Sequence, residues 1–121
     1  MFAYWAGNGD MHLKNLTLAA DREGRHLLSP VYDQVNTAVY PDLDANLALP
    51  LSGNDRHVDR PAWIRFADVL GIPTRAAERV LSRPASLLSE ARTVIDESYL
   101  PKTMQPRYAD VLEARSRVLA P

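Results

Sequence analysis

Hydrophobic and polar positions divide the chain into an irregular first half and a regularly patterned second half. From residue 61 onward, apolar residues recur three or four positions apart, which is the spacing of one face of an α-helix. Gly71, the pair Arg83-Pro84 and Pro101 interrupt this pattern and predict four helical segments. Because the connections between them are short, we expect residues 61–121 to form a helical bundle with antiparallel neighbours.

The residues expected to point into that bundle share one face in each segment. The last segment begins near Pro106. The inward residues, taken segment by segment, are Trp63, Phe66, Ala67 and Leu70, then Ala76, Ala77, Val80 and Leu81, then Leu87, Leu88, Ala91 and Ile95, and finally Tyr108, Val111, Leu112, Val118 and Leu119.

The first sixty residues contain shorter elements. Residues 1–7 are apolar and end at Gly7, which predicts a short buried helix with a glycine stop. Apolar runs at residues 16–19 and 26–28 flank a charged turn and predict a β-hairpin. Residues 34–60 show no long period, although residues 47–51 fit a short edge strand.

A polar loop, residues 7–15, lies between the first helix and the hairpin, as expected of a functional loop on a scaffold. Asp10 and Asn15 lie five positions apart in it, and Asp33 follows Asn15 by 18 positions, across the hairpin. Carboxylate and amide oxygens suit Mg²⁺ and phosphate chemistry. Since a hairpin returns the chain near its start, we expect Asp33 to face Asn15. A simple turn-capping role for Asp10 remains open, because Asn-Gly-Asp is common in turns.

Composition limits the possible classes of protein. With 121 residues, 46% hydrophobic and 24% charged, the chain fits one globular domain. Its net charge of −1 gives no bulk attraction to nucleic acid or to anionic membranes. It has no cysteine and no apolar run long enough to span a membrane. Its first residues lack a basic start and reach Asp10 too soon for a signal peptide, so we expect a cytoplasmic protein without membrane contact.

Residues 2–15, which read F-A-Y-W-A-G-N-G-D-M-H-L-K-N, resemble the catalytic loop of HipA-type serine/threonine kinases, the toxins of bacterial toxin–antitoxin pairs. Residues 31–33 resemble the metal-binding segment of that family, and W-x-x-F-A-x-x-x-G at residues 63–71 is weakly similar to its helical part. The resemblance covers this chain but only the C-terminal third or so of a typical member. It implies a mostly α fold, the C-lobe portion of a protein-kinase-like fold with a small β-hairpin after the catalytic loop.

The resemblance also implies a domain organisation and a set of roles. The chain would be a single domain, with the catalytic loop and metal-binding segment in residues 1–40 and the helical bundle in residues 61–121. The implied catalytic base is Asp10, and the implied Mg²⁺ ligands are Asn15 and Asp33. Residues that would lie by the phosphates of ATP or shape the loop are His12, Lys14 and Tyr32. The phosphoryl acceptor would be a protein hydroxyl.

Parts that an ATP-dependent kinase requires are absent from the sequence. Lys14 and Lys102 are its two lysines, and it has no glycine-rich phosphate loop. We therefore expect the chain to be inactive alone and to need a nucleotide-binding N-lobe from a separate chain. An exposed apolar face along Phe2, Trp5 and the hairpin would mark where that lobe docks.

An alternative function is a non-catalytic remnant or binding module that contacts an antitoxin-like partner or DNA. Arg75, Arg79 and Arg83 are spaced four apart and form a basic stripe, which could meet an acidic partner or DNA phosphate. Exposed helix faces are routinely charged, so a solvated stripe is the more common explanation. With a net charge of −1, DNA contact is expected only through a complex with a partner.

Overall fold

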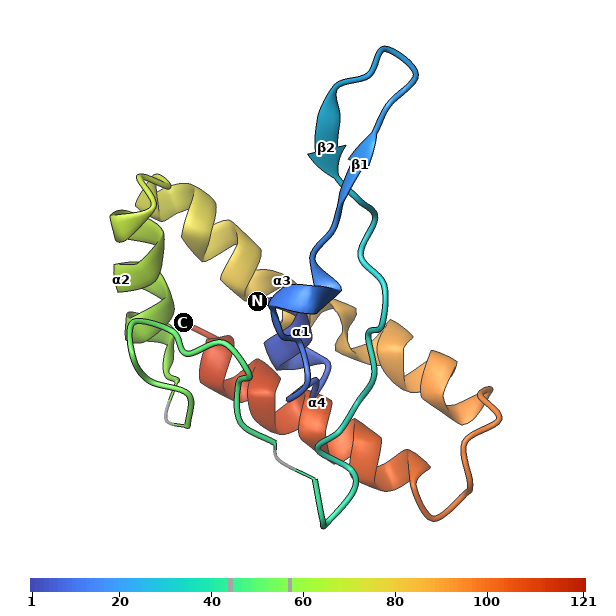
Figure 1. The fold of residues 1–121 in the computed structure, drawn as a ribbon. Helices are drawn as coiled ribbons and strands as arrows, with labels where there is room; N and C mark the ends of the chain where they lie inside the picture. The colour runs from blue at the N-terminus through green and yellow to red at the C-terminus, as the bar shows by residue number, and fades with distance from the viewer. Residues whose placement is uncertain (44, 57) are drawn as a thin grey trace.

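The computed structural model describes residues 1–43, 45–56 and 58–121. Its elements in chain order are α1 (Phe2–Trp5), the 3₁₀ turn η1 (Leu13–Asn15), β1 (Leu18–Ala20), β2 (His26–Leu28), α2 (Arg60–Val69), α3 (Thr74–Asp96) and α4 (Gln105–Leu119). The helices α3 and α4 lie side by side in opposite directions, α2 packs on α3, and α1 rests on α4 (Figure 1). The predicted fold class, mostly α with one antiparallel hairpin, is confirmed.

The prediction of two separate helices on either side of Arg83-Pro84 is wrong, because α3 continues through both residues. A proline inside a helix removes one backbone hydrogen bond and usually costs about 3 kcal/mol. The side chain of Pro84 is among the most deeply buried in the protein, and it follows the buried Leu81 on the same helix. Burial of the ring offsets the lost bond, so the break expected from the sequence does not occur.

Local signals fix the ends of the other helices. The Asp59 carboxylate caps α2 by accepting a hydrogen bond from the Ala62 N–H at 2.8 Å. Gly71 follows the helix with a φ of 68°, the left-handed conformation common after a helix end. Pro106 occupies the first turn of α4, where its missing N–H has no partner to lose.

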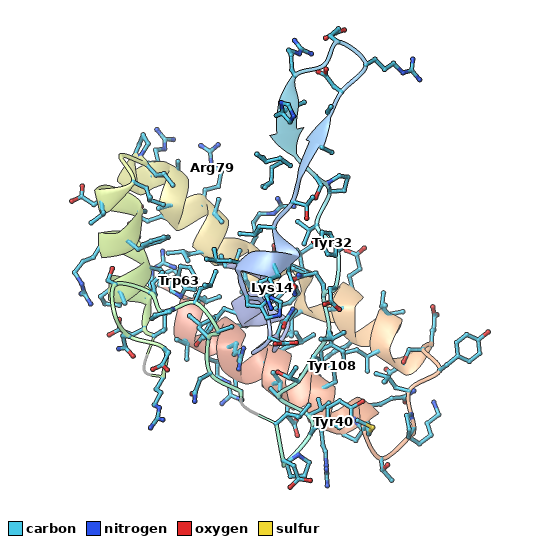
Figure 2. The ribbon with its side chains drawn as sticks, in the orientation of Figure 1. Lys14, Tyr32, Tyr40, Trp63, Arg79 and Tyr108 are labelled. Atoms are coloured by element: carbon cyan, nitrogen blue, oxygen red, sulfur yellow. The ribbon has the colours of Figure 1, made fainter. Side chains whose placement is uncertain are left out.

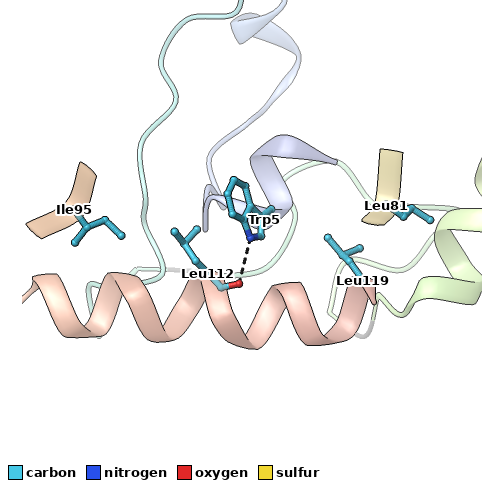
Figure 3. Packing of buried hydrophobic residues seen from close by; sticks show 5 residues of the cluster. All are labelled: Trp5, Leu81, Ile95, Leu112 and Leu119. Carbon is cyan, nitrogen blue, oxygen red and sulfur yellow. Dashed lines mark hydrogen bonds between the residues drawn. The ribbon is translucent and has the colours of Figure 1, made fainter. Parts of the chain in front are cut away.

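The main core joins α1, α3 and α4. Its buried members are Trp5, Leu81, Ile95, Leu112 and Leu119. The Trp5 indole N–H donates to the Leu112 carbonyl at 3.2 Å and to Ser116 Oγ at 2.8 Å, as Figure 3 shows for Leu112. This satisfied, buried indole fixes the short helix α1, and with it the start of the polar loop, against α4.

Arg115 of α4 makes a second attachment to α1. Its guanidinium donates to the Tyr4 carbonyl, donates to the Ala45 carbonyl at 2.8 Å, and lies 4.8 Å from the centre of the Tyr4 ring. Burial lowers the pKa of Arg115 and raises the pKa of the Tyr4 hydroxyl. The arginine thus connects α1, α4 and the loop before α2.

Two predictions for the middle and the helical faces are wrong. Residues 47–51 form no strand; Leu51 makes a single bridge with Asn54 and is buried with Val58 and Ala62 in a second cluster. Four residues expected to point inward are exposed: Leu70 by 57%, Val80 by 46%, Val118 by 40%, and also Ala76.

The hairpin projects away from the helical body (Figure 1). All six residues of its two strands are exposed. Phe2 is 54% exposed, as expected for the proposed docking face, but Trp5 is only 6% exposed and belongs to the core. Trp5 is therefore not part of the exposed docking face that the sequence predicted. None of the helices in the described part of the chain is long and apolar enough to cross a membrane.

Candidate functional site

The polar loop begins at Gly7, which ends α1 with a φ of 81°. The Gly7 carbonyl accepts hydrogen bonds from the N–H groups of Thr37 at 2.9 Å and Ala38 at 3.1 Å. Thr37 Oγ1 also accepts from the Gly9 N–H at 2.8 Å. The loop is thereby tied to the segment that follows Asp33, so both halves of the candidate site share one support.

We expect Gly7→Ala to destabilise the protein by about 3 kcal/mol, because an L-residue is strained at this φ and the new methyl group also meets a neighbour. A Cβ at Gly7 would lie 2.6 Å from Asn36 Oδ1, which accepts from the Val39 N–H at 3.2 Å. Gly24→Ala is the matched control: its φ is 77° but nothing lies within 4 Å of the added methyl. Urea unfolding should show a loss of about 1 kcal/mol for Gly24→Ala; equal losses in both variants would contradict the Asn36 contact.

Asn15 joins the two predicted aspartates. Its side chain is buried, and its amide nitrogen donates to the Asp10 carbonyl at 3.2 Å. The same nitrogen lies 3.4 Å from Asp33 Oδ2. The structure thus brings residues 10, 15 and 33 together, as expected from a hairpin that returns the chain near its start. Because the nitrogen is engaged by these acceptors, the amide oxygen is the atom of Asn15 available to a cation.

Asn8 is a positioning residue that the sequence reasoning missed. It is fully buried, its Oδ1 accepts from the Asp10 N–H at 2.8 Å, and its Nδ2 donates to the Asp33 carbonyl at 3.2 Å. One side chain therefore links the backbones of both aspartates. The Asn-Gly-Asp run was a signal for a turn at Asp10, but nothing in the sequence indicated the bond to Asp33.

Asp33 has a φ of 54°, the left-handed conformation that is uncommon outside glycine. Aspartate tolerates it better than most residues, yet such conformations persist only where surrounding contacts enforce them and are concentrated at functional sites. The bonds from Asn8 and Asn15 supply that support. The conformation is consistent with a carboxylate that is held toward Asn15.

The carboxylate of Asp10 remains open to solvent, with 63% of its side chain exposed. His12 Nε2 approaches Asp10 Oδ1 at 3.9 Å, while His12 Nδ1 is buried and has no hydrogen-bond partner among the described residues. Within the described part of the chain, Asp10 forms hydrogen bonds through its backbone N–H and carbonyl, which leaves the carboxylate accessible to an incoming group.

Tyr32 shapes the loop. Its hydroxyl donates to the Lys14 carbonyl at 2.9 Å and shares a 2.7 Å hydrogen bond with Thr17 Oγ1. Lys14 itself is exposed, and the two residues lie together at the foot of the hairpin (Figure 2). Of the two alternatives open for Tyr32, phosphate contact and loop support, these bonds favour loop support.

The donor set of Asn15 and Asp33 fits Mg²⁺ in chemistry, since both offer hard oxygen atoms. Within residues 1–43, 45–56 and 58–121, no three His, Cys, Asp or Glu side chains gather in a way that could hold a metal. A cation here would take its other ligands from water and phosphate oxygens, as Mg²⁺ commonly does.

Comparison with solved structures identifies the class of fold. HipA of Shewanella oneidensis MR-1, solved with HipB and its operator DNA, matches 96% of this chain and 29% of its own chain, with a TM-score of 0.80 and 24% sequence identity. The architecture is therefore that of the C-terminal portion of the kinase-like HipA fold. The chain belongs to the HipA-like C-terminal domain family, whose sequence model matches residues 1–91.

Two curated relatives carry kinase names. The protein named "Putative kinase Y4mE" of Sinorhizobium fredii is 26% identical over 98% of this chain, and that match spans 30% of Y4mE. A protein named "Putative kinase" of Haemophilus influenzae is 38% identical over 42% of this chain and 16% of its own length. The chain thus spans less than a third of either relative.

Proposed function

We propose that this chain carries the catalytic loop and the metal-binding aspartate of a HipA-like serine/threonine protein kinase. The observation that carries the proposal is the Asn15 amide, which contacts both the Asp10 carbonyl and the Asp33 carboxylate. Family membership and the kinase names of two relatives support it. ATP is the proposed phosphoryl donor and a protein hydroxyl the acceptor.

Asp10 is the proposed catalytic base. Its exposed carboxylate accepts the proton of the acceptor hydroxyl as the hydroxyl oxygen forms a bond to the γ-phosphorus. The bond between that phosphorus and the oxygen bridging to ADP breaks, and ADP leaves with the bonding electrons. Bound Mg²⁺ would supply charge neutralisation on the phosphates, held by the Asp33 carboxylate and the Asn15 amide oxygen.

The nucleotide-binding lobe is proposed to come from residues outside this chain. Phosphoryl transfer from ATP uses a lysine that pairs with the phosphates. Lys102 contacts Gln105 and the Asp96 carbonyl beside α4, and Lys14 is in the catalytic loop. We therefore propose that the isolated chain is inactive and that activity requires the remaining part of the kinase.

We expect Mn²⁺, a probe for the Mg²⁺ site, to broaden the amide NMR signals of residues 15 and 33 selectively in the isolated chain. Asp33→Asn should abolish this effect, since it removes the charged ligand but keeps a residue that tolerates a φ of 54°. Asp21→Asn is the control and should leave the broadening at residues 15 and 33 unchanged. The Asp21 carboxylate pairs with Arg25 at 2.7 Å and is not expected to bind the metal. Equal broadening at residues 21 and 33 would contradict the metal assignment.

The second candidate function is a binding module for an antitoxin-like partner. The observation that favours it is a groove lined in part by arginines. Arg60, Arg75 and Arg79 line one open groove of about 460 Å³ between α2 and α3, together with Glu78 and without Arg83. Arg79 lies on α3, away from the foot of the hairpin (Figure 2). DNA would be reached through the partner complex, as the net charge of −1 indicates. The S. oneidensis neighbour was solved with such a partner and DNA. A cytoplasmic location belongs to both proposals.

A further inference from the structure

The hairpin presents large apolar side chains to water. Leu18 is 64% exposed, Leu28 63% and Leu27 53%, although a folded domain usually covers residues of this kind. A two-stranded hairpin alone is at best marginally stable in water and normally needs a third strand or a packed partner. Among the described residues, no helix covers either strand.

The strand register separates these leucines onto two faces. Leu18 pairs with Leu28 and Ala19 pairs with Leu27, and successive residues of a strand point to opposite sides. Leu16 has extended backbone angles and precedes Leu18 by two positions, so it extends the side of Leu18. We call Leu16, Leu18 and Leu28 the leucine face; Leu27 lies on the opposite side.

The leucine face is attached to the candidate site at its foot. Asn15 directly precedes Leu16, and the Tyr32 hydroxyl binds Thr17 Oγ1 at 2.7 Å. The far end of the hairpin is different, because its charged turn pairs internally through Arg25 and Asp21. Apolar surface thus lies next to the catalytic loop, while the charged tip of the hairpin can remain in contact with water.

We propose that the leucine face is the docking surface for the part of a HipA-like kinase that lies outside this chain, whether joined to it or separate. This inference rests on the proposed function. The chain spans 30% of Y4mE, so most of such a kinase is available as an occupant. A second copy of the chain would cover the same leucines but would add no lysine or phosphate loop to the site.

The test uses the polypeptide encoded directly before this chain in its own genome. We mix or co-express it with the chain without ATP and measure the complex by light scattering and titration calorimetry. We expect a 1:1 complex in which the hairpin amides gain protection from hydrogen exchange. Leu18→Ser and Leu28→Ser should each raise the Kd by about 30-fold, because each removes one buried apolar side chain from the interface.

Leu27→Ser is the matched control, as it makes the same change on the opposite face at similar exposure. It should change the Kd by less than about threefold. Circular dichroism establishes that all variants fold, which their exposed positions predict. Absence of a complex, equal weakening by Leu27→Ser, or self-association of the chain through the leucine face would each overturn the inference.

The outcomes also separate this inference from the proposed function. A complex that depends on the leucine face but transfers no phosphoryl group contradicts the kinase proposal alone. Phosphoryl transfer that survives Leu18→Ser with an unchanged Kd contradicts the docking surface alone.

Discussion

In the proposed kinase, with its nucleotide-binding lobe supplied, Asp10→Asn should lower the rate of phosphoryl transfer from ATP to a protein hydroxyl by about a thousandfold, the contribution typical of a general base. Asparagine has nearly the same size but cannot accept the proton. The fold should be unaffected, because Asp10 bonds to its neighbours through backbone atoms that the substitution leaves in place. Initial rates with radiolabelled ATP measure the effect, and urea unfolding measures the stability.

The matched control is Asp21→Asn, the same chemical change at the tip of the hairpin, where the carboxylate binds Arg25. Its rate should stay within about twofold of the parent, since it lies outside the site. If Asp10→Asn retains full activity, Asp10 is a turn residue and the catalytic assignment is wrong. The binding-module alternative, which is non-catalytic, predicts no phosphoryl transfer by either the parent or the Asp10→Asn variant.

Trp5→Ala should destabilise the chain by about 4 kcal/mol, the cost typical of removing a large aromatic side chain from a core. Trp5 is 6% exposed, and its loss would also remove the hydrogen bonds that the indole N–H donates to Ser116 Oγ and the Leu112 carbonyl. Because total stabilities are commonly 5–15 kcal/mol, this loss is a large part of the whole. Urea denaturation followed by circular dichroism measures it.

Phe2→Ala provides the comparison on the same helix. Phe2 is 54% exposed and makes an edge contact with the Trp5 ring at 6.1 Å between centroids. We expect a loss below about 1 kcal/mol, since little apolar area is removed from the core. Similar losses for both variants would show that α1 is not anchored through Trp5.

The sequence was sufficient for the loop and the hairpin because their signals are local. A glycine with positive φ ends α1, and two apolar runs around a charged turn form β1 and β2. The return of the chain by that hairpin brings Asp33 to Asn15. Spacing along the chain was therefore enough to predict which residues meet.

Features that depend on tertiary packing could not be predicted from the sequence. Pro84 is a local helix breaker, yet α3 continues through it with the ring fully buried. Trp5 was assigned to an exposed docking face because its partners, Leu112 and Ser116, are more than a hundred residues away. The link from Asn8 to the Asp33 carbonyl was unpredictable for a similar reason.

In the proposed function, this chain holds one half of a phosphoryl-transfer site and needs the other half from elsewhere. The most direct measurement is transfer of radiolabelled phosphate from ATP by the chain alone, by the polypeptide encoded before it alone, and by the two together. We predict transfer by the pair and by neither component alone, with a requirement for Mg²⁺. Transfer by the isolated chain, or no transfer by a pair shown to form a complex, would contradict the claim.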